Sequence, residues 1–318
     1  MWKSGEKMLT NFMTVAEQVA ILFILICIGA LAGKTKLIRK EAIPSLNNFV
    51  LFVVTTSVII KSFCREFDTD RLKGLIIAVC LAIFAHIINI FIATIVIKDK
   101  EKSKQNVLRF ATVFSNCGFM AIPLQSAILG DDGVFYGAVY VAVFNIACWT
   151  YGLITMSGGK KNLSIRKIFI NPGVVGVTIG MIIFVFSINL PDIIYMPLSY
   201  VAALNTPLPM IIIGFMLYEI ISAGKTEIKE MLMEKKVYIA IFIRLIVMPL
   251  IMFGLMLMLK VDRLILLSNI ICVSAPVAAT TSMFAEKFGG DKKLSVASVG
   301  ISTIISLITM PVIVSLAM

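Results

Sequence analysis

The chain has 318 residues, of which 59% are hydrophobic and 15% charged, and its mean hydropathy is +0.99. Soluble domains are less apolar and carry about 25% charged residues, so this composition excludes a soluble globular fold. The net charge of +11 comes mainly from basic connections between apolar segments. It predicts contact with an anionic lipid bilayer rather than with nucleic acid.

Ten apolar segments follow one another along the chain, each about as long as a membrane-spanning helix needs to be. They cover residues 14–33, 43–62, 72–97, 107–130, 133–155, 171–190, 196–219, 237–259, 264–287 and 294–317. No stretch between them could form a separate soluble domain, and the alternating pattern of an outer-membrane barrel is absent. The sequence predicts an all-α integral membrane protein with ten transmembrane helices.

The basic residues predict the orientation of these helices. With the N-terminus outside, the inner connections hold 20 of the 29 Lys and Arg residues, and the outer side holds 8. The positive-inside rule therefore predicts a multi-pass protein of the cell (inner or plasma) membrane with both termini outside. Lys3, Lys7 and the run Ala30-Leu31-Ala32 also resemble a cleavable signal peptide, whose removal would leave nine segments.

The polar connection 156–170, predicted to be a cytoplasmic linker, divides the segments into two sets of five, 1–155 and 171–318. Because five is odd, the two sets would cross the membrane in opposite directions, as inverted repeats do. The fourth segment of each set carries a central proline, Pro123 or Pro276. Proline interrupts a helix, and lipid tolerates an interruption only where it is buried in protein or lines a wet cavity. Such a matched pair of breaks predicts the substrate site of a secondary transporter.

Small and polar residues beside the two prolines could bind an organic anion. A helix that restarts inside the membrane begins with free N–H groups and a partial positive charge. Gly118 would open the backbone at the first break, where Asn116 supplies a side-chain amide. The hydroxyl candidates at the second break are Ser274, Thr280, Thr281 and Ser282. Asn47 and Asn205, from the second segment of each set, are further candidates. For all of these residues the alternative is that they hold helices together.

Two ionisable residues lie well inside apolar segments. Arg244 is about 10 Å into the eighth segment at 1.5 Å per residue, and an intramembrane Arg predicts a functional partner. That partner could be the substrate carboxylate, backbone carbonyls or a carboxylate at a helix end such as Glu219, and snorkelling to the surface is a further alternative. His86, the single histidine, could couple transport to protons or serve as a packing residue. No Asp or Glu is central in a segment, so sodium coupling through carbonyl oxygens, or anion exchange, stays open.

The residues needed for catalysis or metal binding are missing from the pattern. The six cysteines form no CxxC pair and have no metal-ligand spacing. With one histidine and no HExxH, GxGxxG or P-loop motif, the sequence predicts neither an enzyme nor an ATP-driven pump. We expect no cofactor, no metal and no disulfide. A membrane sensor or receptor built on a transporter fold is the alternative function.

Four stretches carry a resemblance to a known family: SNCGFMAIPL at 115–124, IRLIVMPL at 243–250, SAPVAATTSMFAEKFGGD at 274–291 and STIISLITMPVI at 302–313. With these the chain resembles the auxin efflux carrier family, in its bacterial, malate- or malonate-permease-like branch. The resemblance implies two inverted five-helix repeats with broken, crossing helices 4 and 9. It also implies transport of a small organic anion, a carboxylate, by an elevator-like alternating-access mechanism in a homodimer. Segments 1, 2, 6 and 7 would be the scaffold and dimer surface, and segments 3–5 and 8–10 the moving unit.

Overall fold

A computed structural model of the chain describes residues 2–159, 170–222 and 233–318. The described residues form helices and their connections, with one isolated β-bridge. Seven helical runs among them are long and apolar enough to cross a membrane, and two shorter apolar helices accompany them. The protein is therefore an all-α, multi-pass membrane protein. Residues 160–169, most of the predicted linker, lie outside the described residues.

In the first half of the chain, four helical regions come first: three contain most of the first three predicted segments, and the fourth ends at Val113, early in the predicted segment 107–130. They are α1 (Trp2–Lys34), the continuous run of α2 (Ile43–Phe49), a π-helical stretch and α3 (Thr56–Phe63), then α4 (Thr69–Val96) and α5 (Lys102–Val113). The chain then continues through α6 (Ile122–Ala147), which joins the predicted fourth and fifth segments, and ends this half in α7 (Leu153–Ser157). Asp68 starts α4, because its carboxylate accepts hydrogen bonds from the free N–H groups of the first turn.

The described part of the second half contains eight α-helices. They are α9 (Pro172–Val185), α10 (Asp192–Ala203), α11 (Pro207–Ser222), α13 (Lys235–Phe242), α14 (Met248–Met258), α15 (Arg263–Ser274), α16 (Thr280–Phe288) and α17 (Lys292–Ala317). The predicted seventh segment, 196–219, is divided between α10 and α11 by a turn at 204–206 that leads into Pro207. Proline suits the first turn of a helix, where its missing N–H is not needed.

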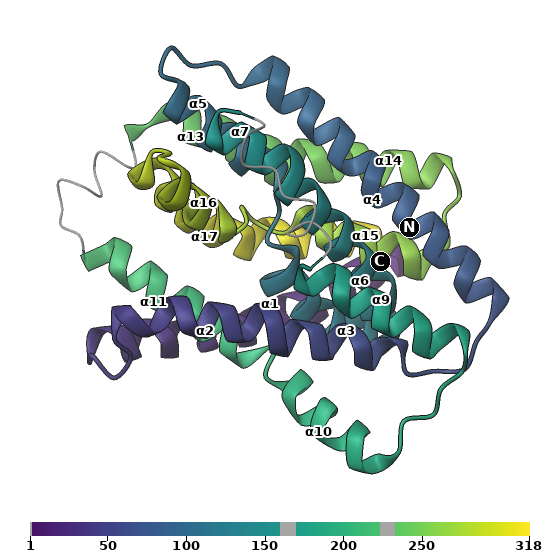
Figure 1. The fold of residues 1–318 in the computed structure, drawn as a ribbon. Helices are drawn as coiled ribbons and strands as arrows, with labels where there is room; N and C mark the ends of the chain where they lie inside the picture. The colour runs from purple at the N-terminus through teal and green to yellow at the C-terminus, as the bar shows by residue number, and fades with distance from the viewer. Residues whose placement is uncertain (1, 160–169, 223–232) are drawn as a thin grey trace.

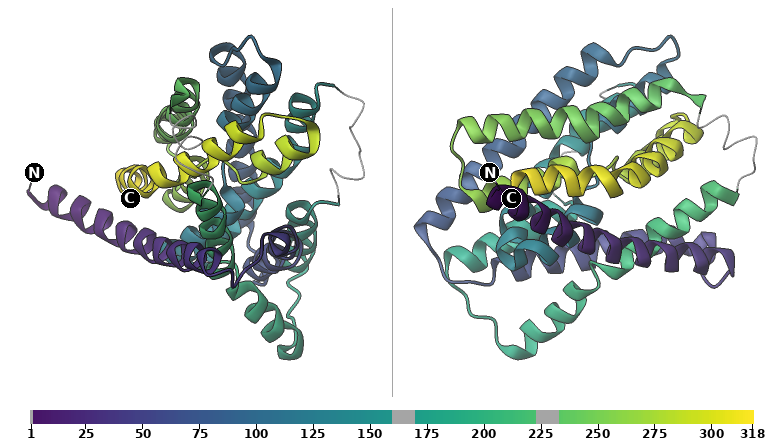
Figure 2. Two further views of the ribbon diagram at one scale, coloured as in Figure 1. Left: turned by 90° about the vertical axis from the view of Figure 1, so that its left-hand side faces the viewer. Right: turned by 180° about the vertical axis from the view of Figure 1, so that it is seen from behind.

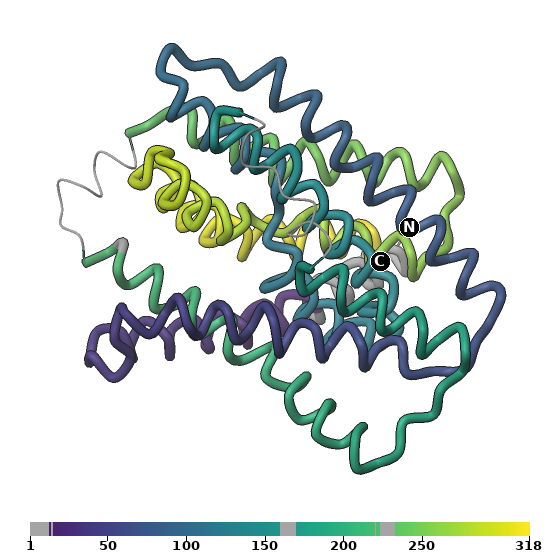
Figure 3. The backbone as a smooth tube through the Cα atoms, in the orientation of Figure 1, coloured from purple at the N-terminus to yellow at the C-terminus, as the bar shows by residue number. Residues whose placement is uncertain are grey.

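The helices form two groups that pack side by side. The first group contains α1, α2, α3, α9, α10 and α11, and the second contains α4–α7 and α13–α17 (Figures 1 and 2). Figure 3 traces the same path as a tube, with the first group below the second. Within the first group, α1 and α11 pack backbone to backbone, and a Cβ on Gly214 would lie 1.9 Å from the Ile26 carbonyl oxygen. Glycine is required there because the two backbones touch.

The connections alternate between two ends of the molecule. Connections 35–39, 97–101 and 289–291 lie at one end, and connections 64–68, 186–191 and 259–262 lie at the other (Figure 1). At the first end, Lys236 donates to Asp99 at 2.6 Å, and this hydrogen bond lowers the pKa of the Asp99 carboxyl. The ion pair ties the α4–α5 connection to α13.

Gly130 interrupts α6 and permits the sharp change of direction between the predicted fourth and fifth segments. Its φ is 65° and its ψ is −159°, a conformation that is open to glycine but strained for other residues. We expect Gly130→Ala to lower the free energy of unfolding by about 1–3 kcal/mol. Thermal unfolding in detergent would measure the loss. Gly254→Ala is the matched control, because Gly254 lies in a regular helix with open space beside it, where alanine should be neutral or stabilising. Equal unfolding temperatures for both variants would contradict the assignment of strain.

Candidate functional site

Two helices are interrupted in the interior, and their interruptions pair with each other. The first lies between α5 and the π-helical turn Cys117–Ala121 that leads into α6, and the second lies between α15 and α16. Ser115 and Val277 form an antiparallel β-bridge. The Asn116 N–H donates to the Pro276 carbonyl at 2.7 Å, and the Ala278 N–H donates to the Phe114 carbonyl at 2.9 Å. The two breaks therefore satisfy each other's backbone groups away from water, as a membrane interior requires.

The first break was predicted at Pro123, but it lies earlier in the chain. Pro123 is in the first turn of α6, just after the π-helical turn, whereas the chain leaves the helix at Phe114. The wider π-turn accommodates the missing proline N–H without ending the helix. The same arrangement recurs at Pro249, which follows the π-helical turn Ile243–Val247. Pro276 lies within the second break, as expected.

Gly118 follows the first break within the π-helical turn and faces open space, since no atom lies within 4 Å of a Cβ built there. It therefore opens the surface beside the break rather than causing the break.

Arg244 joins the ends of the two interrupted helices and is fully buried. Its Nη1 donates to the Val113 carbonyl at 2.9 Å and to the Thr112 carbonyl at 3.5 Å, and its Nη2 donates to the Val273 carbonyl. These carbonyls end α5 and α15, where a helix has unpaired acceptors and a partial negative charge. The sequence left several partners of Arg244 open, and the contacts found in the described structure are with backbone carbonyls.

The carboxylate suggested as a partner of Arg244 is engaged elsewhere. Glu219 pairs with Lys40 at 2.6 Å. Among the described residues, no carboxylate forms an ion pair with Arg244, and the ionisable groups that face its guanidinium are Tyr140 and Cys117. The cation is thus compensated by helix ends and not by an acidic side chain.

His86 lies close to this junction without taking part in it. Its Nδ1 lies 2.8 Å from the carbonyl oxygen of Ala82, one turn earlier in α4, and its ring centroid is 5.1 Å from that of Tyr140. Its Nε2 is buried and has no hydrogen-bond partner among the described residues. The contacts of the ring are those of a packing residue.

The beginnings of the two resumed helices carry unpaired polar groups. Asn116 precedes the π-helical turn, and its side-chain amide nitrogen is buried without a partner among the described residues. At the start of α16, the hydroxyl oxygens of Thr280, Thr281 and Ser282 are likewise unpaired within the described chain. Ser274 differs from these, because its hydroxyl donates to the Ile271 carbonyl of its own helix.

A cavity of about 620 Å³ separates the two groups of helices beside the second break. It lies between α2 and α11 on one side and α16 and α17 on the other. The polar residues of its wall are Asn47, Asn48, Ser282, Ser295 and Thr303, and the charged residues at its mouth are Lys40, Glu219, Glu286, Lys287 and Lys292. The cavity therefore leads from a charged surface at one end of the molecule toward the beginning of α16.

The structure brings some predicted residues to this cavity and leaves others apart. Asn47 and Ser282 line it, whereas its described lining includes neither Asn116 nor Arg244, which lie at the crossing. Asn205 also lies apart, where its side-chain oxygen accepts a hydrogen bond from the Thr55 hydroxyl at 3.3 Å. That contact joins the turn before α11 to the second helical run.

One set of buried polar residues was not predicted from the sequence. Hydroxyl side chains follow one face of α17, at Ser295, Ser298, Ser302, Thr303 and Ser306. Ser302 supports the second break directly, because its hydroxyl oxygen accepts a hydrogen bond from the Val277 N–H at 3.1 Å. The signal was present in the spacing of three or four residues between Ser295, Ser298, Ser302 and Ser306, the period of a helix face.

An all-helical membrane protein in which two interrupted helices meet beside a cavity has the features of a membrane transporter. Comparison with known proteins agrees, since the model of the membrane transport protein family matches residues 14–165 and 159–314. The chain therefore belongs to this family, that of the auxin efflux carriers. It is also similar to an uncharacterized transporter of Methanocaldococcus jannaschii, with 22% identity over 214 residues, or 63% of this chain and 68% of the relative.

Proposed function

We propose that the protein is a secondary active transporter of a small organic anion, a carboxylate. The observation that carries this proposal is the balance of charge at the crossing. The negative ends of α5 and α15 are compensated by Arg244. The positive ends that begin at Asn116 and Thr280 carry unpaired donors, and no described carboxylate pairs with them. One anion would complete the balance, because helix N-termini bind anions through their free N–H groups.

The cavity supports a route to this site. It extends from the end of the molecule that carries Lys40 and Lys292 to Ser282, in the first turn of α16. The basic side chains at its mouth would attract an anion, and the wall residues Asn47 and Ser282 would accompany it inward. Membership of a transport family favours a permease over an enzyme.

The two helix groups suggest how the anion would cross. In this proposal the group containing α1 and α11 is a scaffold and dimer surface, and the group containing the crossing moves against it in an elevator-like, alternating-access cycle. The two five-helix sets would be inverted repeats, and the protein would lie in the cell membrane as a homodimer with both termini outside. A proton or sodium gradient would drive accumulation.

Uptake into proteoliposomes tests the proposal. Purified protein should take up labelled malate or malonate with saturable kinetics and should exchange internal for external anion. Liposomes without protein are the control, and imposed proton or sodium gradients identify the coupling ion. If folded protein takes up no organic anion under any gradient but binds one in solution, the transporter proposal fails and a membrane sensor is supported.

A further inference from the structure

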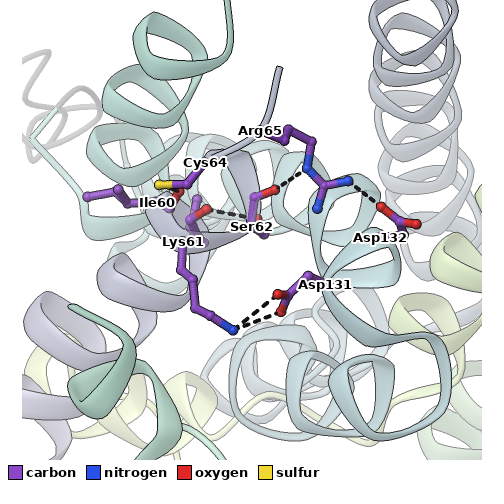
Figure 4. A network of polar contacts seen from close by, with 8 residues as sticks. Ile60, Lys61, Ser62, Cys64, Arg65, Asp131 and Asp132 are labelled. Atoms are coloured by element: carbon purple, nitrogen blue, oxygen red, sulfur yellow. Dashed lines mark hydrogen bonds and ion pairs between the residues drawn. The ribbon is translucent and has the colours of Figure 1, made fainter. Parts of the chain in front are cut away.

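The end of the molecule opposite the cavity mouth is closed by ion pairs between the two helix groups. Lys61, in the last turn of α3, lies 3.1 Å from both carboxylate oxygens of Asp131, and Arg65 contacts the carboxylate of Asp132 (Figure 4). The basic residues belong to the first helix group, and the carboxylates follow the Gly130 kink of α6 in the second. We name Lys61, Arg65, Asp131 and Asp132 the latch.

Arg65 is held in place by two contacts besides its carboxylate partner. Its Nε donates to the Ser62 carbonyl at 2.8 Å, and its guanidinium lies 4.6 Å from the centre of the Phe135 ring on α6. Arg71 of α4 adds a third cation 3.8 Å from Asp132. The Arg65 side chain is 14% exposed, whereas Asp131 and Asp132 are about half exposed. Arg65 is therefore preorganised on the scaffold side to receive a carboxylate.

We propose that the latch holds this end closed while the cavity is open at the other end, and that it must separate when the carrier opens toward the latch side. The proposal rests on the proposed function, since it assigns the two ends to one transport cycle. The geometry supports it because the ion pairs and the cavity lie at opposite ends of the same contact between the helix groups. A movement that brought the second group toward the latch side would carry Asp131 and Asp132 away from Lys61 and Arg65.

The latch is expected to bias the cycle and not to lock it. Each partly exposed ion pair contributes little free energy. A carrier must also populate both the inward-open and the outward-open state at equilibrium. Loss of both pairs should therefore raise the population open on the latch side by about threefold to tenfold.

Cysteine labelling of both ends would test the latch. The reporters are Ser62→Cys, at a position buried beneath the latch, and Met283→Cys, at an exposed position of the cavity wall, each in a full-length variant without native cysteines. With Asp131→Asn and Asp132→Asn, a maleimide should label Ser62→Cys about threefold to tenfold faster and Met283→Cys more slowly. The charge exchange Lys61→Asp with Asp131→Lys should restore slow labelling of Ser62→Cys in the presence of Asp132.

The control is Asp70→Asn with Lys73→Met, which removes an exposed ion pair within α4 and should change neither rate. Faster labelling of both reporters would mean that the fold has loosened. Unchanged labelling rates in a protein with an unchanged unfolding temperature would mean that the ion pairs do not affect which end is open. Either result overturns the latch. A reciprocal change in a protein that transports no anion would instead uphold the latch and reject the proposed function.

Discussion

Replacement of Arg244 by methionine should lower the free energy of unfolding by about 2–5 kcal/mol and abolish uptake. Methionine has a similar length but no donors, so the carbonyls of Val113 and Val273 would lose their charged partner inside the protein. The Val113 carbonyl would keep only the Asn89 amide as a side-chain donor, at 3.2 Å, and the Val273 carbonyl would lose its side-chain donor. An unsatisfied buried polar group costs about 1–3 kcal/mol, and the loss of the cation at both helix ends adds to this cost. The crossing would separate, and with it the surfaces that we propose bind the anion.

Thermal unfolding and proteoliposome uptake would measure the two effects. Arg109→Met is the matched control, because Arg109 also donates to carbonyls at a helix end, those of Thr94 and Ile97, but at the edge of the protein. Its loss should cost less than about 1 kcal/mol, since water can replace the donor. Arg244→Lys should fall between the two, because a single ammonium cannot reach both helix ends as the planar guanidinium does. An Arg244→Met variant that unfolds at the native temperature and transports normally would refute the role of Arg244.

Asn116→Ala should reduce uptake by about tenfold to a hundredfold while leaving the unfolding temperature unchanged or slightly raised. The Asn116 amide nitrogen is buried without a partner among the described residues, so its removal relieves an unpaired donor and costs no hydrogen bond. A hydrogen bond to a charged group is worth about 1.5–3 kcal/mol, which corresponds to the expected loss of anion binding. The backbone pairing of Asn116 with Pro276 does not depend on the side chain and should persist.

The informative comparison for Asn116→Ala is Asn269→Ala. Asn269 is also a buried amide near the second break, but its nitrogen donates to the Ile265 carbonyl of its own helix. That variant should lose some stability and keep its uptake, the reverse of the result expected for Asn116→Ala. If both variants lose uptake in proportion to stability, Asn116 has only a structural role.

Features that depend on the neighbours along the chain were readable from the sequence. Continuous apolar runs predicted a helical membrane protein because each helix satisfies its own backbone hydrogen bonds within lipid. Pro276 marked the second break, and here the signal and its consequence lie within one segment.

Features that depend on contacts between distant segments appeared only in the tertiary structure. The first break lies at 114–116 and not at Pro123, because Phe114 and Asn116 gain backbone partners at Pro276 and Ala278, while a π-turn accommodates the proline. The cavity wall combines α2 and α11 with α16 and α17, and the latch joins Lys61 to Asp131, 70 residues later. The membrane class followed from the sequence alone, since hydropathy acts locally. The pairing of the two breaks depends on the tertiary structure. A backbone group without a helical partner forms its hydrogen bond with an acceptor or donor that packing places beside it.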